Sequence, residues 1–210
     1  MAALGGASLI GAVSSGCVQY AMGLPVADSF TDLYRTRAER FGRDEARHTQ
    51  RWNAVANLRL VFFLLALGGT VWGILDRDAL IAGVSGALWV IFLGLVRYHA
   101  RLARQRARSG AFRAVNEEAL RRIARDWQTL PLREAPLPSP EHPYAYDLDL
   151  YGTGSLVHLL DTTGTRPGYA TLRAWLETPA APDQVQLRQG AVRELAPLLE
   201  LRQKLQVEGR

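Results

Sequence analysis

The sequence contains very little cysteine and lysine. Cys17 is the only cysteine among 210 residues, so the chain cannot form an intramolecular disulfide or a cysteine-based zinc site. Lys204 is the only lysine, and every other basic residue is an arginine. The histidines follow no spacing typical of metal ligands, so we interpret them as surface, interface or packing residues. They are His48, His99, His142 and His158.

Charge is absent from the first 27 residues, which are rich in alanine, glycine and serine. No basic residue precedes an apolar stretch there, so a secretory signal peptide is not predicted. The run VSSGC ending at Cys17 weakly suggests a lipidation site, and glycine and serine dilute the apolarity that a third membrane span would need. We favour a disordered or misassigned tail over 1–33, with Met22 as an alternative start.

Charge is also absent from two long runs, 60–75 and 79–96, which only the sequence DRD at 76–78 separates. At about 1.5 Å per residue the runs span roughly 24 and 27 Å. A bilayer core is about 30 Å thick, and flanking arginines extend short spans by snorkelling. Neither run has the polar stripe of a soluble amphipathic helix. We therefore predict a transmembrane helical hairpin over 58–97, with a buried hairpin of a soluble protein as the alternative.

Small residues within both runs predict close packing of the two helices. Gly69 and Gly73 lie four apart on the first run, and Ala79, Gly83 and Ala87 repeat this spacing on the second.

Arginines crowd both outer flanks of the hairpin, whereas the turn has one arginine between two aspartates. The positive-inside rule then predicts that both long ends are cytoplasmic.

Four arginines beyond the second run step by four, three and four residues and share one helix face: Arg97, Arg101, Arg104 and Arg108. They are candidate contacts for anionic lipid headgroups or for a nucleic-acid phosphate backbone. Their position at the membrane boundary, and the lack of interleaved aromatic residues for base stacking, favour lipid. A plain topology determinant is an equally good interpretation.

Amphipathic helices are expected on both sides of the hairpin, over 34–57 and 98–130. The second has an apolar face that needs a packing partner, for which the first is the candidate, and pairs spaced one helical turn apart at Glu117–Arg121 and Glu118–Arg122. The apolar face contains Phe112, Val115, Ala119, Ile123 and Trp127.

A proline-rich linker over 131–145 leads into a module over 146–210. Tyr146, Leu148 and Leu150 alternate with polar residues, as in a short strand with one buried face. Asp147 and Asp149 are conceivable as a metal pair, but solvated strand residues are the better interpretation.

Helices are predicted after this strand. Ser155 should cap a short helix over 156–160, and a second helix should end before Pro179. Asp183 should cap a third, and Pro197 either breaks it or starts a further helix.

The chain lacks a GxxxxGK[ST] loop, a catalytic triad, an acid–base pair and a metal cluster. We expect no enzyme activity and no cofactor in these residues.

Two segments of the module resemble a known family. The sequence DLDLYGTGSLVHLLDTTGTRPGYATLRAWLETPA, followed by LRQGAVRELAPLLELRQKL, resembles the start of the helical core domain of MutS-type DNA mismatch repair proteins. The whole chain is similar to a bacterial MutS-like subgroup with a membrane hairpin in place of the mismatch-reading domain. The tyrosine- and arginine-rich start (34–51) and the EHPYAYDLDLYG segment (141–152) carry that similarity.

The resemblance implies a mainly α-helical fold: a transmembrane hairpin, cytoplasmic helices, and an incomplete MutS-type core opened by a short strand. It implies the N-terminal portion of a DNA-binding, ATP-hydrolysing protein of the bacterial inner membrane. ATP and magnesium belong to a domain absent from this chain, DNA is a partner through the family, and a homodimer would form through missing regions. The alternative is a non-enzymatic membrane-anchored scaffold or protein-interaction module. A transporter or sensor is disfavoured because the spans contain no ionisable residue.

Overall fold

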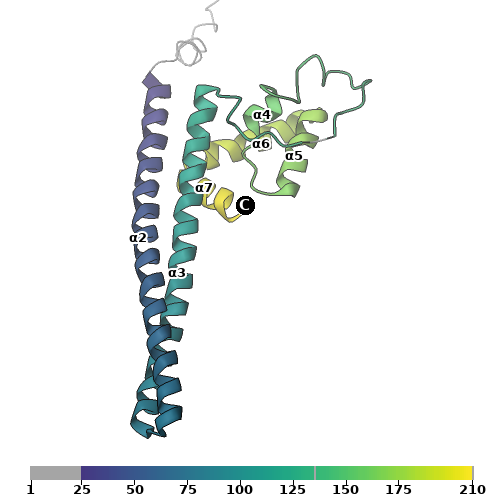
Figure 1. Cartoon of the computed structure of the whole chain (residues 1–210). Coiled ribbons are helices and arrows are strands. Elements are labelled where there is room, and N and C mark those ends of the chain that lie inside the picture. Colours follow the sequence, from purple (N-terminus) through teal and green to yellow (C-terminus); the bar gives the residue numbers. More distant parts are fainter. Residues whose placement is uncertain (1–24, 135, 210) are drawn as a thin grey trace, which may run out of the picture.

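The computed structural model describes residues 25–134 and 136–209, and this part of the chain is mainly α-helical with no strand (Figure 1). The predicted mainly helical class is confirmed at this level. Residues 1–24 of the predicted tail lie outside the described part, and helix α2 begins at Pro25. The helices are α2 (Pro25–Asp76), α3 (Ala79–Ala124), α4 (Leu156–Leu160), α5 (Arg166–Glu177), α6 (Pro182–Leu195) and α7 (Leu199–Glu208).

Helices α2 and α3 pack along one another as a long antiparallel hairpin (Figure 1). The turn between them lies in the predicted DRD sequence. Arg77 has a left-handed backbone (φ 55°), and the Asp78 carboxylate accepts hydrogen bonds from the Leu80 and Ile81 amides (2.8 and 3.4 Å). An aspartate at this position satisfies amides that have no partner within the helix. The hairpin turn therefore follows from local capping chemistry.

Both uncharged runs continue without a break into the polar segments on either side. Helix α2 has 52 residues and α3 has 46, which corresponds to about 78 and 69 Å at 1.5 Å per residue. The hairpin is therefore more than twice as long as a bilayer core of about 30 Å. Its open end is polar, and its closed end is apolar except for the turn.

The open end brings together the two amphipathic segments that the sequence predicted as partners. The rings of Phe41 and Phe112 stack with centroids 4.9 Å apart, and the Arg113 guanidinium lies 3.2 Å from the Glu45 carboxylate. Val115, on the predicted apolar face, is buried. Helix α7 also packs against α3 here.

The predicted strand over 146–150 is wrong. The Leu148, Asp149 and Leu150 amides donate to the Tyr144, Tyr146 and Ala145 carbonyls, which makes consecutive turns. Asp149 has a left-handed φ of 45°, which an extended strand excludes. Leu150 is buried while Leu148 is 59% exposed, so the alternating residues do not share one buried face.

The short helices end and begin mostly where the sequence predicted. Ser155 caps α4 by accepting a hydrogen bond from the His158 amide, and α5 ends before Pro179. Asp183 is not the cap of α6. It lies in the first turn without a capping bond, because Ala181 is the N-cap and Pro182 takes the first helical position. Pro197 separates α6 from α7.

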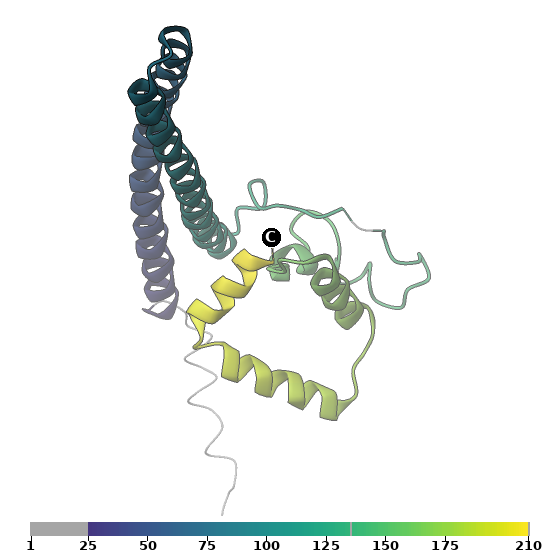
Figure 2. The same cartoon turned by 90° about the horizontal axis from the view of Figure 1, so that it is seen from below.

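Helices α5, α6 and α7 form three sides of an open ring beside the hairpin (Figure 2). No residue of α5 or α6 is buried. Large apolar side chains of α5 and α6 are exposed: Trp175, Val185, Leu187, Val192 and Leu195.

Candidate functional site: the apolar hairpin and its arginine flank

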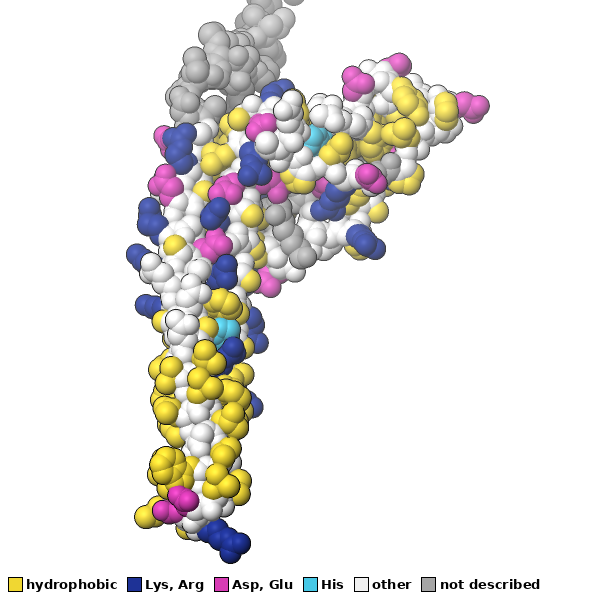
Figure 3. All heavy atoms as spheres, viewed as in Figure 1, with side chains coloured by type: hydrophobic (Ala, Val, Ile, Leu, Met, Phe, Trp, Pro, Cys, Tyr) yellow, Lys and Arg dark blue, Asp and Glu magenta, His cyan; other side chains and the backbone are white. Residues whose placement is uncertain are grey.

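Large apolar side chains cover the closed half of the hairpin on the face shown in Figure 3. Both helices are long and apolar enough to cross a membrane, and only 11% and 6% of their most apolar windows are buried within the molecule. A core helix of a soluble protein would be mostly buried, which these two helices are not. We call these residues the apolar belt. They are Leu60, Val61, Leu64, Leu65, Leu67, Val71, Trp72, Ile74 and Leu75 on α2, and Leu80, Val84, Val90, Ile91 and Leu93 on α3.

The predicted small residues of α2 lie in the helix–helix contact. A Cβ atom added to Gly73 would lie 3.1 Å from the Ala82 backbone nitrogen, and one added to Gly69 would lie 2.5 Å from the Ser85 hydroxyl. The predicted stripe of α3 is wrong, because Ala79, Gly83 and Ala87 are exposed. The buried Ser85 lies against Gly69 in their place, and Gly73 meets the backbone of Ala82. Gly83 has no neighbour that an added Cβ would meet.

Aromatic and hydroxyl side chains complete the interior of the belt. Phe63, Trp89 and Phe92 form a cluster with ring centroids 5.6 to 5.8 Å apart. The Trp89 indole donates to the Thr70 hydroxyl at 3.2 Å, and that hydroxyl donates to the Ala66 carbonyl at 2.7 Å. The few polar atoms between the helices are therefore satisfied locally, as an apolar solvent requires.

The four predicted arginines occupy the boundary where the apolar belt ends. Arg97, Arg101 and Arg104 are exposed and have no ion-pair partner among the described residues. Arg108 differs, because its guanidinium lies 3.5 Å from the Glu208 carboxylate of α7. Both side chains of that pair are more than half exposed, so the pair contributes little to stability.

Histidine and tryptophan rings fill the hairpin at the level of these arginines. Trp52 of α2 lies against His99 of α3 with ring centroids 4.7 Å apart, and the Arg106 guanidinium lies 5.6 Å from the Trp52 ring. One ring nitrogen of His99 and one of His48 are buried with no hydrogen-bond partner in the described part of the chain. His48 and His99 are thus packing residues.

Arg122 joins the hairpin to the helices that follow the linker. Its guanidinium donates to the carbonyls of His158, Leu159 and Asp161 at 2.7, 2.9 and 2.5 Å, and it also donates to Glu118 at 2.7 Å. Those carbonyls end α4, where the helix dipole favours a cation. The predicted Glu118–Arg122 pair is confirmed, whereas Glu117 pairs with Arg113 in place of the predicted Arg121. Its long-range carbonyl contacts are invisible to sequence spacing.

A second polar network ties three helices together. Gln203 of α7 donates to the Asn116 side chain of α3 at 2.7 Å and accepts from the Arg37 guanidinium of α2 at 3.1 Å. Asn116 also donates to the Phe112 carbonyl at 2.7 Å. Asn116 and Gln203 are buried, so the network fixes the register of α7 against the hairpin.

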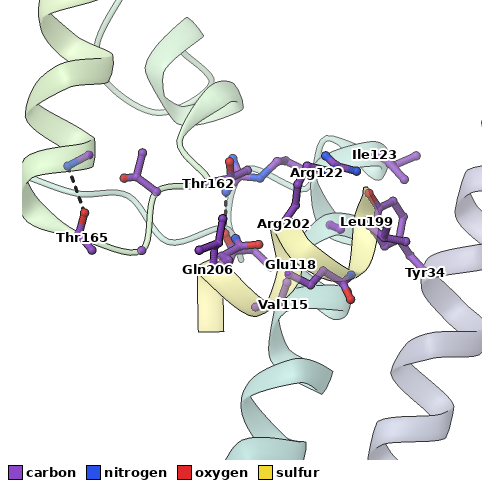
Figure 4. A pocket seen from close by; sticks show the side chains of 16 residues that line it. Tyr34, Val115, Glu118, Arg122, Ile123, Thr162, Thr165, Leu199, Arg202 and Gln206 are labelled. Atoms are coloured by element: carbon purple, nitrogen blue, oxygen red, sulfur yellow. Dashed lines mark hydrogen bonds and ion pairs between the residues drawn. The ribbon is translucent and has the colours of Figure 1, made fainter. Parts of the chain in front are cut away.

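A cavity of about 670 Å³ lies between α3, α7 and the turn that precedes α5 (Figure 4). Arg122 and Glu118 line it but are already engaged with each other and with α4. The remaining lining mixes apolar side chains such as Val115 and Leu199 with threonines of the 162–165 turn. Among the described residues that line the cavity, no cluster of free charged or nucleophilic groups occurs.

Residues of the EHPYAYDLDLYG segment fasten the linker to α5. His142 and the Tyr144 hydroxyl contact the Glu177 and Leu176 carbonyls at 3.0 and 3.1 Å. The Tyr151 hydroxyl donates to the Glu177 carboxylate and accepts from Arg173. Burial raises the pKa of the Tyr151 phenol, and the hydrogen bond from that phenol lowers the pKa of Glu177.

Asp147 and Asp149 are exposed, and the described residues contain no group of three or more side chains able to hold a metal ion. No protein-family model matches the chain, and no curated protein or solved structure is significantly similar to it. The exposed apolar hairpin with its arginine flank is therefore the site that the geometry of the described residues defines best.

Proposed function

We propose that the hairpin anchors the helical module, residues 146–209, to a lipid bilayer. The observation that carries this proposal is the exposure of the apolar belt on both helices. Soluble monomers rarely expose contiguous apolar patches larger than a few hundred Å², and each buried Å² of apolar surface is worth roughly 25 cal/mol. A bilayer covers such a belt, and no other part of the described chain does.

The charges at the two ends of the belt set the proposed orientation. Arginines flank the open side on both helices, whereas the turn has Arg77 between Asp76 and Asp78. Under the positive-inside rule the arginine side faces the cytoplasm. We propose the bacterial inner membrane, with the turn on the outer side and the module in the cytoplasm.

We propose further that the module is the start of a MutS-like core domain. The chain would then be the N-terminal portion of a DNA mismatch repair family protein whose ATP- and magnesium-binding domain lies outside it. The resemblance of residues 147–205 to the family supports this. The exposed apolar side chains of Trp175, Leu187 and Val192 support it too, because they suit helices that pack against further protein. DNA binding and dimerisation would belong to those further regions.

The second candidate is a non-enzymatic membrane-anchored scaffold. The same exposed surface of α6 favours it, because an unpacked helix face suits a separate protein partner. The two proposals share the anchor and differ in what covers α6.

The size of the native protein in the bacterial membrane fraction, detected with an antibody raised against residues 144–209, distinguishes these candidates. A membrane band far larger than 23.2 kDa, which hydrolyses ATP and binds mismatched DNA after purification, supports the MutS-like proposal. A membrane band at 23.2 kDa favours the scaffold. Protein that stays soluble without detergent refutes the anchor and both candidates with it.

A further inference from the structure

We infer that the hairpin selects anionic phospholipids through a carboxylate-free arginine girdle at the cytoplasmic edge of the apolar belt. The girdle consists of Arg51 and Arg59 on α2 and Arg97, Arg101 and Arg104 on α3. The girdle differs from the predicted stripe in two ways. It omits Arg108, which pairs with Glu208, and it includes two arginines of α2. The inference rests on the proposed membrane anchor and adds the lipid class that the anchor recognises.

Acidic residues are missing from the whole neighbourhood of the girdle. No aspartate or glutamate occurs in 46–75 or in 79–116, although those segments contain all five girdle arginines. None of the five has an ion-pair partner in the described part of the chain. Farther along the same helices, by contrast, Arg43 and Arg113 pair with Glu39 and with Glu45 and Glu117. The absence of carboxylates is therefore local to the membrane boundary.

The packing of the hairpin brings the arginines of both helices to one level. The contact between Trp52 and His99 places Arg51 and Arg101 at about the same height along the hairpin axis. In Figure 3, basic side chains lie just beyond the apolar belt on both edges of the hairpin. A ring of cations around a membrane-spanning hairpin can contact several headgroups at once.

The dimensions of the α3 stripe fit a headgroup layer. Arg104 follows Arg97 by seven positions, which is about 10 Å of helix at 1.5 Å per residue. The headgroup region on each side of a bilayer is about 5 to 8 Å thick, and arginine side chains can snorkel along the helix to reach it. Tyr98, which is half exposed beside Arg97, is a residue type enriched at this depth.

Lipid is a better occupant than nucleic acid because of where the girdle begins. Arg97 directly follows the last residue of the uncharged run, and Arg59 directly precedes the first. A nucleic acid bound there would have to lie against the bilayer surface. The phosphates that are always present at that depth are those of the lipid headgroups.

Tryptophan quenching by brominated phospholipids tests the inference in the full chain reconstituted into vesicles. Brominated phosphatidylglycerol is compared with brominated phosphatidylcholine at equal mole fraction. We expect phosphatidylglycerol to be enriched around the protein by at least about five-fold, the factor for about 1 kcal/mol from one arginine near the surface. Raising the salt concentration to about 0.5 M should reduce the enrichment, because the Debye length falls.

The variant Arg97→Gln/Arg101→Gln/Arg104→Gln should lose most of the enrichment while it incorporates into vesicles like the parent. Its charge-matched control, Arg125→Gln/Arg166→Gln/Arg193→Gln, changes exposed arginines outside the girdle and should keep the enrichment. Equal quenching by both lipids in the parent chain would overturn the inference. So would a girdle variant that loses affinity for a short DNA duplex but keeps its lipid preference. Failure to enter either kind of vesicle would instead refute the membrane anchor.

Discussion

Removal of the Arg122 side chain should loosen the module from the hairpin more than any other single arginine change. The side chain is only 11% exposed and its Glu118 partner 10%. Hydrogen bonds to a charged group contribute roughly 1.5–3 kcal/mol each, and leaving a buried ion without its partner costs about 3–5 kcal/mol. These terms overlap, so we expect Arg122→Ala to destabilise the contact between α3 and α4 by about 4 kcal/mol.

Amide hydrogen exchange followed by mass spectrometry in detergent micelles measures this effect directly. A loss of about 4 kcal/mol should speed exchange in 152–165 by roughly a thousand-fold, since each 1.4 kcal/mol is a factor of ten. Exchange in 60–75, inside the hairpin, should not change and serves as the internal reference.

Two further variants decide whether the reasoning is right. Arg121→Ala removes the neighbouring arginine, whose guanidinium makes only a long 3.5 Å contact with the Thr129 carbonyl, and should leave exchange in 152–165 within a factor of about two. Arg122→Met combined with Glu118→Met should recover part of the loss, because no buried charge is then left unpaired. Equal effects of Arg121→Ala and Arg122→Ala would refute the assignment of Arg122.

Three other expectations test separate parts of the structure. Gly73→Ala should destabilise the hairpin by about 1–3 kcal/mol in thermal melts, because its Cβ would press on the Ala82 backbone. Gly83→Ala should not destabilise it. Equal melting points of the two variants would contradict the packing. The lowered pKa of Glu177 adds stability above its ordinary pKa of about 4.3 that is lost as pH falls through the lowered value. Tyr151→Phe should reduce the difference between the free energies of unfolding measured in urea at pH 6 and at pH 3.5. An unchanged difference would contradict this prediction. Asn116→Ala should lower the free energy of unfolding by about 1–3 kcal/mol and expose α7 to proteolysis. An Asn116→Gln variant with wild-type stability would argue against this role of Asn116.

The closed half of the hairpin could be predicted from sequence because every decisive feature is local. Charge is absent over the two long runs, the aspartates at 76 and 78 interrupt the apolar pattern, and Asp78 caps the next helix. The face that each helix turns toward the other helix was less predictable from the sequence. Several small residues lie on α3, and only the three-dimensional packing places Ser85 and the Ala82 backbone against α2 while Gly83 and Ala87 are exposed.

The structure of the module was harder to predict from the sequence, because its local patterns are compatible with more than one secondary structure. The alternation of Tyr146, Leu148 and Leu150 is compatible with a strand, yet tertiary contacts bury only Leu150 and the backbone turns at Asp149. The Glu118–Arg122 pair could be read from helical spacing. The three carbonyls that Arg122 also holds are 36 to 39 residues away in the chain, beyond any local pattern.

Site-specific thiol labelling tests the membrane-anchored hairpin most directly. In a Cys17→Ser background, single cysteines replace Arg77 at the turn and Gln186 in α6, and spheroplasts are treated with a membrane-impermeant maleimide. The account predicts that the thiol at position 77 reacts in intact spheroplasts, whereas the thiol at position 186 reacts only after permeabilisation. Reaction at position 186 in intact spheroplasts would contradict the orientation, and protein that fractionates as soluble would contradict the anchor itself.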